Sequence, residues 1–269
     1  MNKKLLIIII ASIVIAGVFI ALATKKISSK INSGNQASPS SLLSQVHAQE
    51  AKGDLSEAKL LYQKLVNDYP EASDVTDWQK KAEDINIKLL FSSTITPKSI
   101  NYTIKPGDTL NKIAREYKTT AELIMKSNNI SDSLIMPGRK IKVSNVPFTI
   151  LVDKSQNILL LKSDEEIFKT YTVSTGKNNC TPVGTFKIVN KLSNPTWFKA
   201  GAVVPAESPE NVLGTRWLGF DLAGYGIHGT TEPKELGKQV TQGCVRLCNS
   251  DVEELYSIIP VGTEVTIIE

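Results

Sequence analysis

One histidine and one cysteine near the C-terminal end of this chain have the types and the spacing for nucleophilic catalysis. His228 lies sixteen residues before Cys244 in the segment YGIHGTTEPKELGKQVTQGCVRL, and it is one of only two histidines. A thiol is a weak nucleophile until a base removes its proton, and imidazole is the side chain best suited to that near neutral pH. Spacing alone also fits a small buried cysteine and a structural histidine.

The residues beside Cys244 fit the catalytic interpretation. Gly243 leaves the backbone free to bend, so that a substrate carbonyl could approach the amides of Gly243 and Cys244, which would hold a developing oxyanion. Arg246 lies on the same face as Cys244 if this segment is a strand. Its guanidinium can bind a carboxylate through two parallel hydrogen bonds. The segment therefore predicts a nucleophile, its base and a carboxylate-binding arginine.

Residues 147–269 resemble the catalytic domain of the L,D-transpeptidases. The family motif is a histidine-glycine pair, a spacer, a serine or threonine, a variable residue and Gly-Cys-[Val/Ile]-Arg, matched here by IHGT and TQGCVRL. The segment KNNCTPVGTFKI resembles the family's threonine-proline-x-glycine-x-phenylalanine stretch. Gln242 stands where many members have a second histidine, and Thr241 replaces the commoner serine. Neither change removes a group that the chemistry requires.

The resemblance implies acyl transfer on the stem peptides of peptidoglycan. Cys244 would attack a tetrapeptide stem, release the terminal D-alanine and hold a thioester that an amine acceptor then takes. His228 would serve as base and later as acid, and the backbone carbonyl of Gly229 would replace the aspartate of a triad. The substrate-binding candidates are Trp217, Tyr225, Thr230, Thr241 and Arg246.

Two other functions fit parts of the same sequence. A hydrolase of the L,D-carboxypeptidase type would use the same thioester and pass the acyl group to water, and nothing in the sequence separates it from a transferase. A non-catalytic scaffold would only bind the cell wall, but intact His228 and Cys244 argue against it.

The cysteines give no sign of a metal site. No cluster has the spacing of structural zinc, so neither a metal nor another cofactor is expected. The odd count of three is compatible with one reactive thiol. A disulfide between Cys180 and Cys248 stays open.

A small glycan-binding module is predicted at residues 101–145. The segment from Tyr102 to Val143 predicts a strand, two helices and a strand, with Asp108 capping the first helix and Thr119 with Glu122 forming a capping box for the second. It is similar to a lysin-motif (LysM) domain, a βααβ module that binds N-acetylglucosamine-containing glycans, although a folded spacer is the alternative. The resemblance implies a glycan site at Pro106, Gly107, Asp108, Thr109, Asn128 and Asn129.

Residues 1–27 predict a membrane segment. Leu5 to Ala23 is apolar apart from Ser12, and it would reach about 28 Å as a helix, close to the hydrocarbon thickness of a bilayer. Its length favours a transmembrane anchor, whereas Ala21-Leu22-Ala23 has the form of a signal-peptide cleavage site. Either outcome places the protein in the cell envelope, anchored or secreted.

A linker at residues 28–41 leads to a predicted helical hairpin at residues 42–91. Asp54 and Glu57 form a capping box there, and Pro70 is a helix stop. The pattern resembles a single tetratricopeptide hairpin, which would be a spacer or a docking surface for a protein partner. His47 lies in this stretch and is expected to be solvated.

The whole chain of 269 residues is expected to be a multidomain α+β protein. Residues 1–146 carry a net charge of +7 and residues 147–269 carry −3. This charge distribution does not indicate a nucleic-acid-binding surface. The catalytic domain should be mainly β, a sandwich or a partly closed barrel. Its expected strands and helix are Phe148–Val152, Ile158–Leu161, Phe168–Thr175, Gly184–Val189, Val265–Ile268 and the helix Asp251–Ile258.

Overall fold

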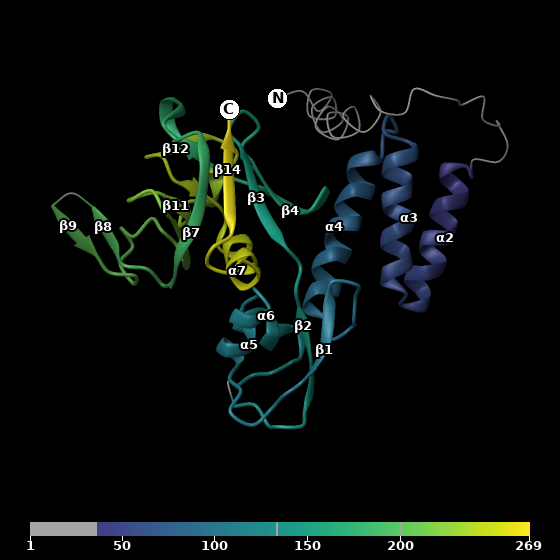
Figure 1. Cartoon of the computed structure of the whole chain (residues 1–269). Helices are drawn as coiled ribbons and strands as arrows, with labels where there is room; N and C mark the ends of the chain where they lie inside the picture. The colour runs from purple at the N-terminus through teal and green to yellow at the C-terminus, as the bar shows by residue number, and fades with distance from the viewer. Residues whose placement is uncertain (1–36, 133, 200) are drawn as a thin grey trace, which may run out of the picture. The chain divides into compact units, whose positions relative to one another are not determined.

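A computed structural model describes residues 37–132, 134–199 and 201–269. The chain divides into two compact units, one ending at Ile87 and the other beginning at Lys88 (Figure 1). The predicted membrane segment at residues 5–23 and most of the linker at 28–41 lie outside the described residues. Among the helices that the structure does describe, none is long and apolar enough to cross a bilayer.

The first unit is helical. It contains α2 (Pro39–Lys52), α3 (Leu55–Asp68) and most of α4 (Val75–Phe91). The carboxylate of Asp54 accepts the Glu57 amide at 3.1 Å, which is one half of the predicted capping box, whereas the Asp54 amide donates to the Gln49 carbonyl at 2.9 Å. Helix α3 ends before Pro70. The prediction of a two-helix hairpin over 42–91 was wrong, because a turn at residues 70–74 starts a third helix. His47 is exposed, as expected.

The βααβ module has the predicted order of elements. β1 (Ser99–Thr103) pairs antiparallel with β2 (Lys140–Ser144), and α5 (Leu110–Glu116) and α6 (Ala121–Ser127) lie between them in the chain. The apolar faces of all four elements form one core, to which the buried side chains of Tyr102, Ile104, Leu110, Ile113, Ile124, Ile141 and Val143 contribute.

Both helix caps of this module lie one residue later in the chain than predicted. Thr109 caps α5 by accepting the Lys112 amide at 3.2 Å. Asp108 cannot do so, because its carboxylate already accepts the Tyr102 hydroxyl at 2.7 Å and the Lys105 amide at 2.8 Å. Similarly, the hydroxyl of Thr120, the residue after Thr119, accepts the Leu123 amide at 2.9 Å at the start of α6.

The C-terminal domain is mainly β, as predicted. Eight strands form one mixed sheet in the order β13-β11-β10-β7-β14-β3-β4-β5. β14 is parallel to β3, and β11 is parallel to β13, whereas the other neighbours are antiparallel. The strands are β3 (Phe148–Asp153), β4 (Ile158–Ser163), β5 (Glu166–Thr172), β7 (Gly184–Ser193), β10 (Arg216–Phe220), β11 (Gly226–His228), β13 (Val245–Arg246) and β14 (Glu264–Ile268).

The long strand β7 explains how this sheet curls. Its residues Gly184 to Lys187 pair with β14, and its residues Ile188 to Ser193 pair with β10. One strand therefore belongs to both halves of the sheet, which agrees with a partly closed barrel. Two-stranded pairs add to it: β6 (Thr175–Gly176) with β12 (Gln239–Thr241), and β8 (Trp197–Lys199) with β9 (Ala202–Val204). Helix α7 (Asn249–Ile258) packs against β10 and β11.

Candidate active site

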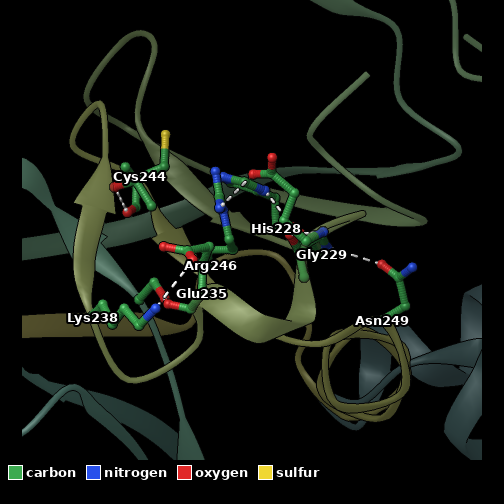
Figure 2. A network of polar contacts seen from close by, with 11 residues as sticks. His228, Gly229, Glu235, Lys238, Cys244, Arg246 and Asn249 are labelled. Atoms are coloured by element: carbon green, nitrogen blue, oxygen red, sulfur yellow. Dashed lines mark hydrogen bonds and ion pairs between the residues drawn. The ribbon is translucent and has the colours of Figure 1, made fainter. Parts of the chain in front are cut away.

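Parallel pairing of two short strands brings the histidine and cysteine motifs together. His228 is the last residue of β11, Arg246 is the last residue of β13, and the two are register partners. Cys244 comes directly before β13. All three side chains line one cleft of about 670 Å³, together with Trp217, Tyr225, Thr241 and Gln242. Figure 2 shows Cys244, His228 and Arg246 on these neighbouring segments.

His228 is held in one orientation by the chain itself. Its side chain is buried, with 3 % of the residue exposed, and Nδ1 lies 2.7 Å from the carbonyl oxygen of Gly229. A carbonyl oxygen only accepts hydrogen bonds, so Nδ1 carries the hydrogen and Nε2 of the neutral ring is free to take a proton. Burial lowers the pKa of His228 to about 4, against the opposing effect of hydrogen bonds with the backbone of Gly229 and Leu213, and the Arg246 charge adds to the lowering. The imidazole is therefore neutral at pH 7.

Cys244 is partly buried, and its Sγ lies 3.5 Å from the carbonyl oxygen of Gly224. Burial raises the pKa of the Cys244 thiol above its ordinary value, although the Arg246 charge opposes this. Near neutral pH the pair therefore rests as a thiol and a neutral imidazole. A cysteine in this state becomes a good nucleophile only when a base takes its proton.

The glycine before the nucleophile is required, as the sequence suggested. Gly243 has φ of 121°, in the region that L side chains rarely adopt. A Cβ at this position would lie 2.7 Å from the Tyr225 ring. The turn is closed by Thr241, whose hydroxyl accepts the Gly243 amide at 3.2 Å and donates to the Cys244 carbonyl at 2.6 Å.

These two bonds correct part of the predicted oxyanion site. The N–H of Gly243 is engaged by Thr241 inside the turn, so we retain only the Cys244 amide as the oxyanion candidate. Thr241 lines the cleft, but its hydroxyl is used to shape the nucleophile turn rather than turned to a substrate.

Arg246 is a buried cation with unused hydrogen-bonding capacity. Only 7 % of the residue is exposed, and Nη1 lies 3.3 Å from Oε2 of Glu232. Within the part of the chain that the structure describes, its Nε has no hydrogen-bond partner. Because Arg246 lines the cleft, its guanidinium is the candidate there for binding a carboxylate.

Comparisons with known proteins identify the families of two domains of this chain. Residues 147–267 match the YkuD family, described as an L,D-transpeptidase catalytic domain, and residues 102–144 match the LysM domain. The chain is 35% identical over 175 residues to the protein named L,D-transpeptidase YkuD of Bacillus licheniformis, which covers 62% of this chain and 97% of that relative. This chain belongs to the L,D-transpeptidase family.

Two further similarities each cover less than half of this chain. The protein named L,D-transpeptidase YqjB of Bacillus subtilis is 41% identical over 124 residues, which is 44% of this chain and 69% of that one. The NMR structure of the catalytic domain of an E. faecium L,D-transpeptidase is 23% identical, covering 45% of this chain and 96% of that chain with a TM-score of 0.38.

Of the remaining substrate-binding candidates in the transpeptidase domain, two line the cleft and one does not. Trp217 is the cross-strand partner of His228, and the two rings stack with centroids 6.0 Å apart. Trp217 and Tyr225 both line the cleft. Thr230 does not, so its prediction as a substrate ligand was wrong: it is buried, and its hydroxyl accepts the Glu232 amide at 2.9 Å.

All three cysteines of the transpeptidase domain are free. Cys180 is exposed, whereas Sγ of Cys248 lies 3.0 Å from the Ser250 hydroxyl, so the disulfide left open by the sequence is not formed. Among the described residues, no group of three or more histidine, cysteine or acidic side chains could hold a metal ion.

The LysM domain presents part of its predicted glycan site. Pro106, Gly107, Thr109 and Asn129 are exposed. Asn128 is not available, because its amide donates to Ile124 and Lys142 carbonyls at 2.8 Å and accepts the Lys142 amide at 2.7 Å. Asp108 is likewise engaged, as described above. These two residues support the loops rather than present donors to a sugar.

Sequence reasoning missed several residues around these sites. Leu134 and Met136 are large apolar side chains that are 81% and 75% exposed on the loop after α6 of the LysM domain. Glu232 pairs with Arg246 from fourteen residues away. Their sequence signals are weak, because a single exposed apolar or acidic residue in a loop is ordinary.

Proposed function

We propose that this protein is a peptidoglycan L,D-transpeptidase in which Cys244 is the nucleophile and His228 the general base. One observation carries the proposal: β11 and β13 set His228 in register with Arg246, two residues after Cys244, so that all three line one cleft. The hydrogen bond from Nδ1 to the Gly229 carbonyl supports the choice of Nε2 as the basic nitrogen.

The acylation step follows from these groups. Nε2 of His228 takes the thiol proton as Sγ of Cys244 attacks the stem-peptide carbonyl, and the amide of Cys244 donates to the oxygen that becomes negative. The imidazolium then gives its proton to the departing D-alanine nitrogen, and a thioester remains on Cys244. An acceptor amine loses a proton to His228 as it attacks the thioester, which regenerates the thiol.

Arg246 gives the cleft its preference for an acidic peptide. Its guanidinium lines the cleft and pairs with the more exposed Glu232, so a substrate carboxylate could compete for it. The indole of Trp217 and the ring of Tyr225 supply apolar wall beside it. A stem peptide offers both a carboxylate and aliphatic carbons, so it matches this lining.

The function is tested with the intact protein, a soluble tetrapeptide stem and a free D-amino acid. We expect mass spectrometry to detect a tetrapeptide in which the added D-amino acid replaces D-alanine. A product consisting only of the tripeptide would support the hydrolase instead. Absence of any turnover, with an intact fold by circular dichroism, would contradict both enzymatic functions.

The LysM domain would tether the enzyme to glycan strands of the same polymer. Replacing both Leu134 and Met136 by serine should weaken binding to insoluble peptidoglycan, because about 1 kcal/mol, or about fivefold, is expected for each partly buried apolar side chain. Turnover of the soluble tetrapeptide should not change. Co-sedimentation with purified walls measures the binding.

The matched control for this experiment is Leu60→Ser. Leu60 is also a large apolar side chain, 56% exposed, but it lies on α3. Equal wall binding by the control and by the double variant would contradict a glycan contact at the loop after α6.

We also propose a place in the cell envelope, because the substrate lies there and Leu5 to Ala23 is long enough to anchor the protein. N-terminal sequencing of the mature protein separates an anchor, which keeps these residues, from a signal peptide, which loses them. A protein partner at the helices α2 to α4 stays a prediction.

A further inference from the structure

A side chain outside the cleft forms hydrogen bonds with the segment that orients His228. Asn249, the first residue of α7, is partly buried, and its Oδ1 accepts two backbone N–H groups. One comes from Thr230 at 3.0 Å and the other from Thr215 at 3.2 Å. Figure 2 shows this amide reaching from the helix to the segment that follows His228.

The bond to Thr230 acts on the peptide unit that contains the Gly229 carbonyl. A peptide unit is planar, and no peptide bond among the described residues is cis, so this carbonyl and the Thr230 N–H point in opposite directions. Fixing the N–H therefore fixes the carbonyl. The same carbonyl oxygen lies 2.7 Å from Nδ1 of His228. Asn249 thus binds the N–H of this planar peptide unit, and the C=O of the same unit binds the imidazole.

The chain leaves room for this amide. A Cβ added to Gly229 or to Gly214 would lie 2.2 Å from Oδ1 of Asn249, closer than any real contact. At Gly214 it would also lie 2.4 Å from the Thr230 nitrogen. Two glycines on different segments are therefore needed around one side-chain oxygen. Thr215 is the residue directly before β10. The Asn249 side chain therefore links α7 to the start of β10 and to the segment after β11.

From this geometry we infer that Asn249 is a positioning residue for His228, acting through the Gly229–Thr230 peptide unit. The inference rests on the proposed role of His228 as base. The order of contacts is Asn249 to peptide to imidazole, so Asn249 touches neither the substrate nor the reacting atoms. Its bond to the N–H also polarises the peptide and makes the Gly229 oxygen a better acceptor.

Two substitutions separate positioning from simple support of the fold. Asn249→Ala removes the acceptor and frees the peptide to rotate. Asn249→Asp keeps an oxygen acceptor at the same place, but it adds a negative charge that favours the imidazolium. If the relay exists, alanine should slow the reaction and aspartate should rescue it at pH 7 with a changed pH profile. A purely structural asparagine predicts no such shift.

The experiment measures acylation of the intact protein by a carbapenem as a function of pH. For Asn249→Ala we expect a 10-fold to 100-fold slower first-order step, about what misplacing a catalytic group costs, with little change in the concentration at half-saturation. For Asn249→Asp we expect a rate within about threefold of the original and an acid limb moved to higher pH. Tyr171→Phe is the control, because it removes the 2.9 Å bond to Glu254 on α7 without touching the Gly229–Thr230 peptide.

A second readout does not depend on activity. The chain has only two histidines, and His47 is exposed, so nitrogen NMR of the imidazoles can follow His228 directly. We expect the Nδ1–H tautomer in the original protein and a tautomer mixture in Asn249→Ala. An unchanged tautomer in Asn249→Ala would overturn the inference, as would equal rate losses in Asn249→Ala and Tyr171→Phe. Failure of the proposed function would appear differently, as absent turnover in the unsubstituted protein.

Discussion

Replacing Cys244 by alanine should abolish both turnover of the tetrapeptide and formation of a covalent adduct with a carbapenem. The sulfur is the only protein atom that bonds to the acyl group in the proposed mechanism, so its loss should reduce the rate by about 10⁴-fold or more. Intact-protein mass spectrometry reads the adduct as an added mass, and peptide mapping assigns it to a residue.

The other two cysteines provide matched controls. Cys180 is more exposed than Cys244 and would react first if exposure alone decided, and Cys248 is only four residues from the proposed nucleophile. Cys180→Ala and Cys248→Ala should both keep the adduct. An adduct on either of these residues in the Cys244→Ala protein, with turnover retained, would refute the mechanism.

Replacing His228 by alanine should slow acylation strongly near pH 7 and change how the rate depends on pH. In the original protein the imidazole pKa of about 4 keeps the base available, so the rate should be nearly flat above about pH 5. Without the base, only the thiolate reacts. Burial raises the pKa of Cys244, and an ordinary cysteine already titrates at about 8.5. The rate should then rise about tenfold per pH unit.

Stopped-flow acylation between pH 5 and 9 measures these two profiles. Trp217 also touches the histidine, so Trp217→Phe is a useful control, since it keeps an aromatic ring against His228 and should keep the flat profile. A flat profile for His228→Ala would show that another group takes the thiol proton.

The backbone bend at Cys244 could be predicted because it depends on residues that are adjacent in sequence. Gly243 next to Cys244 signalled a backbone bend, and the structure gives it a φ that other residues avoid. The longer strands could be predicted because they are runs of apolar residues: Phe148–Val152 and Ile158–Leu161 were expected, and the strands observed are Phe148–Asp153 and Ile158–Ser163. β11 and β13 were not, since strands of three and two residues show no periodicity.

The positioning groups could not be predicted, because their partners are set by topology. Thr230 and Thr241 carry the same hydroxyl, yet one caps a turn outside the cleft and the other closes the nucleophile turn. Asn249 looks like any polar residue at a helix start until α7 is placed beside β11. The cap at Thr109 was missed because the carboxylate one residue earlier had a competing partner in Tyr102.

The position of β14 has a consequence for how the chain assembles. This strand comes after every other strand of the sheet in sequence, yet it lies inside the sheet between β3 and β7. Its contact with β3 joins Val265 to Ile150, across more than a hundred residues. The two halves of the sheet can therefore meet only after residues 264–268 have emerged during synthesis. Such distant pairing makes folding slow and late.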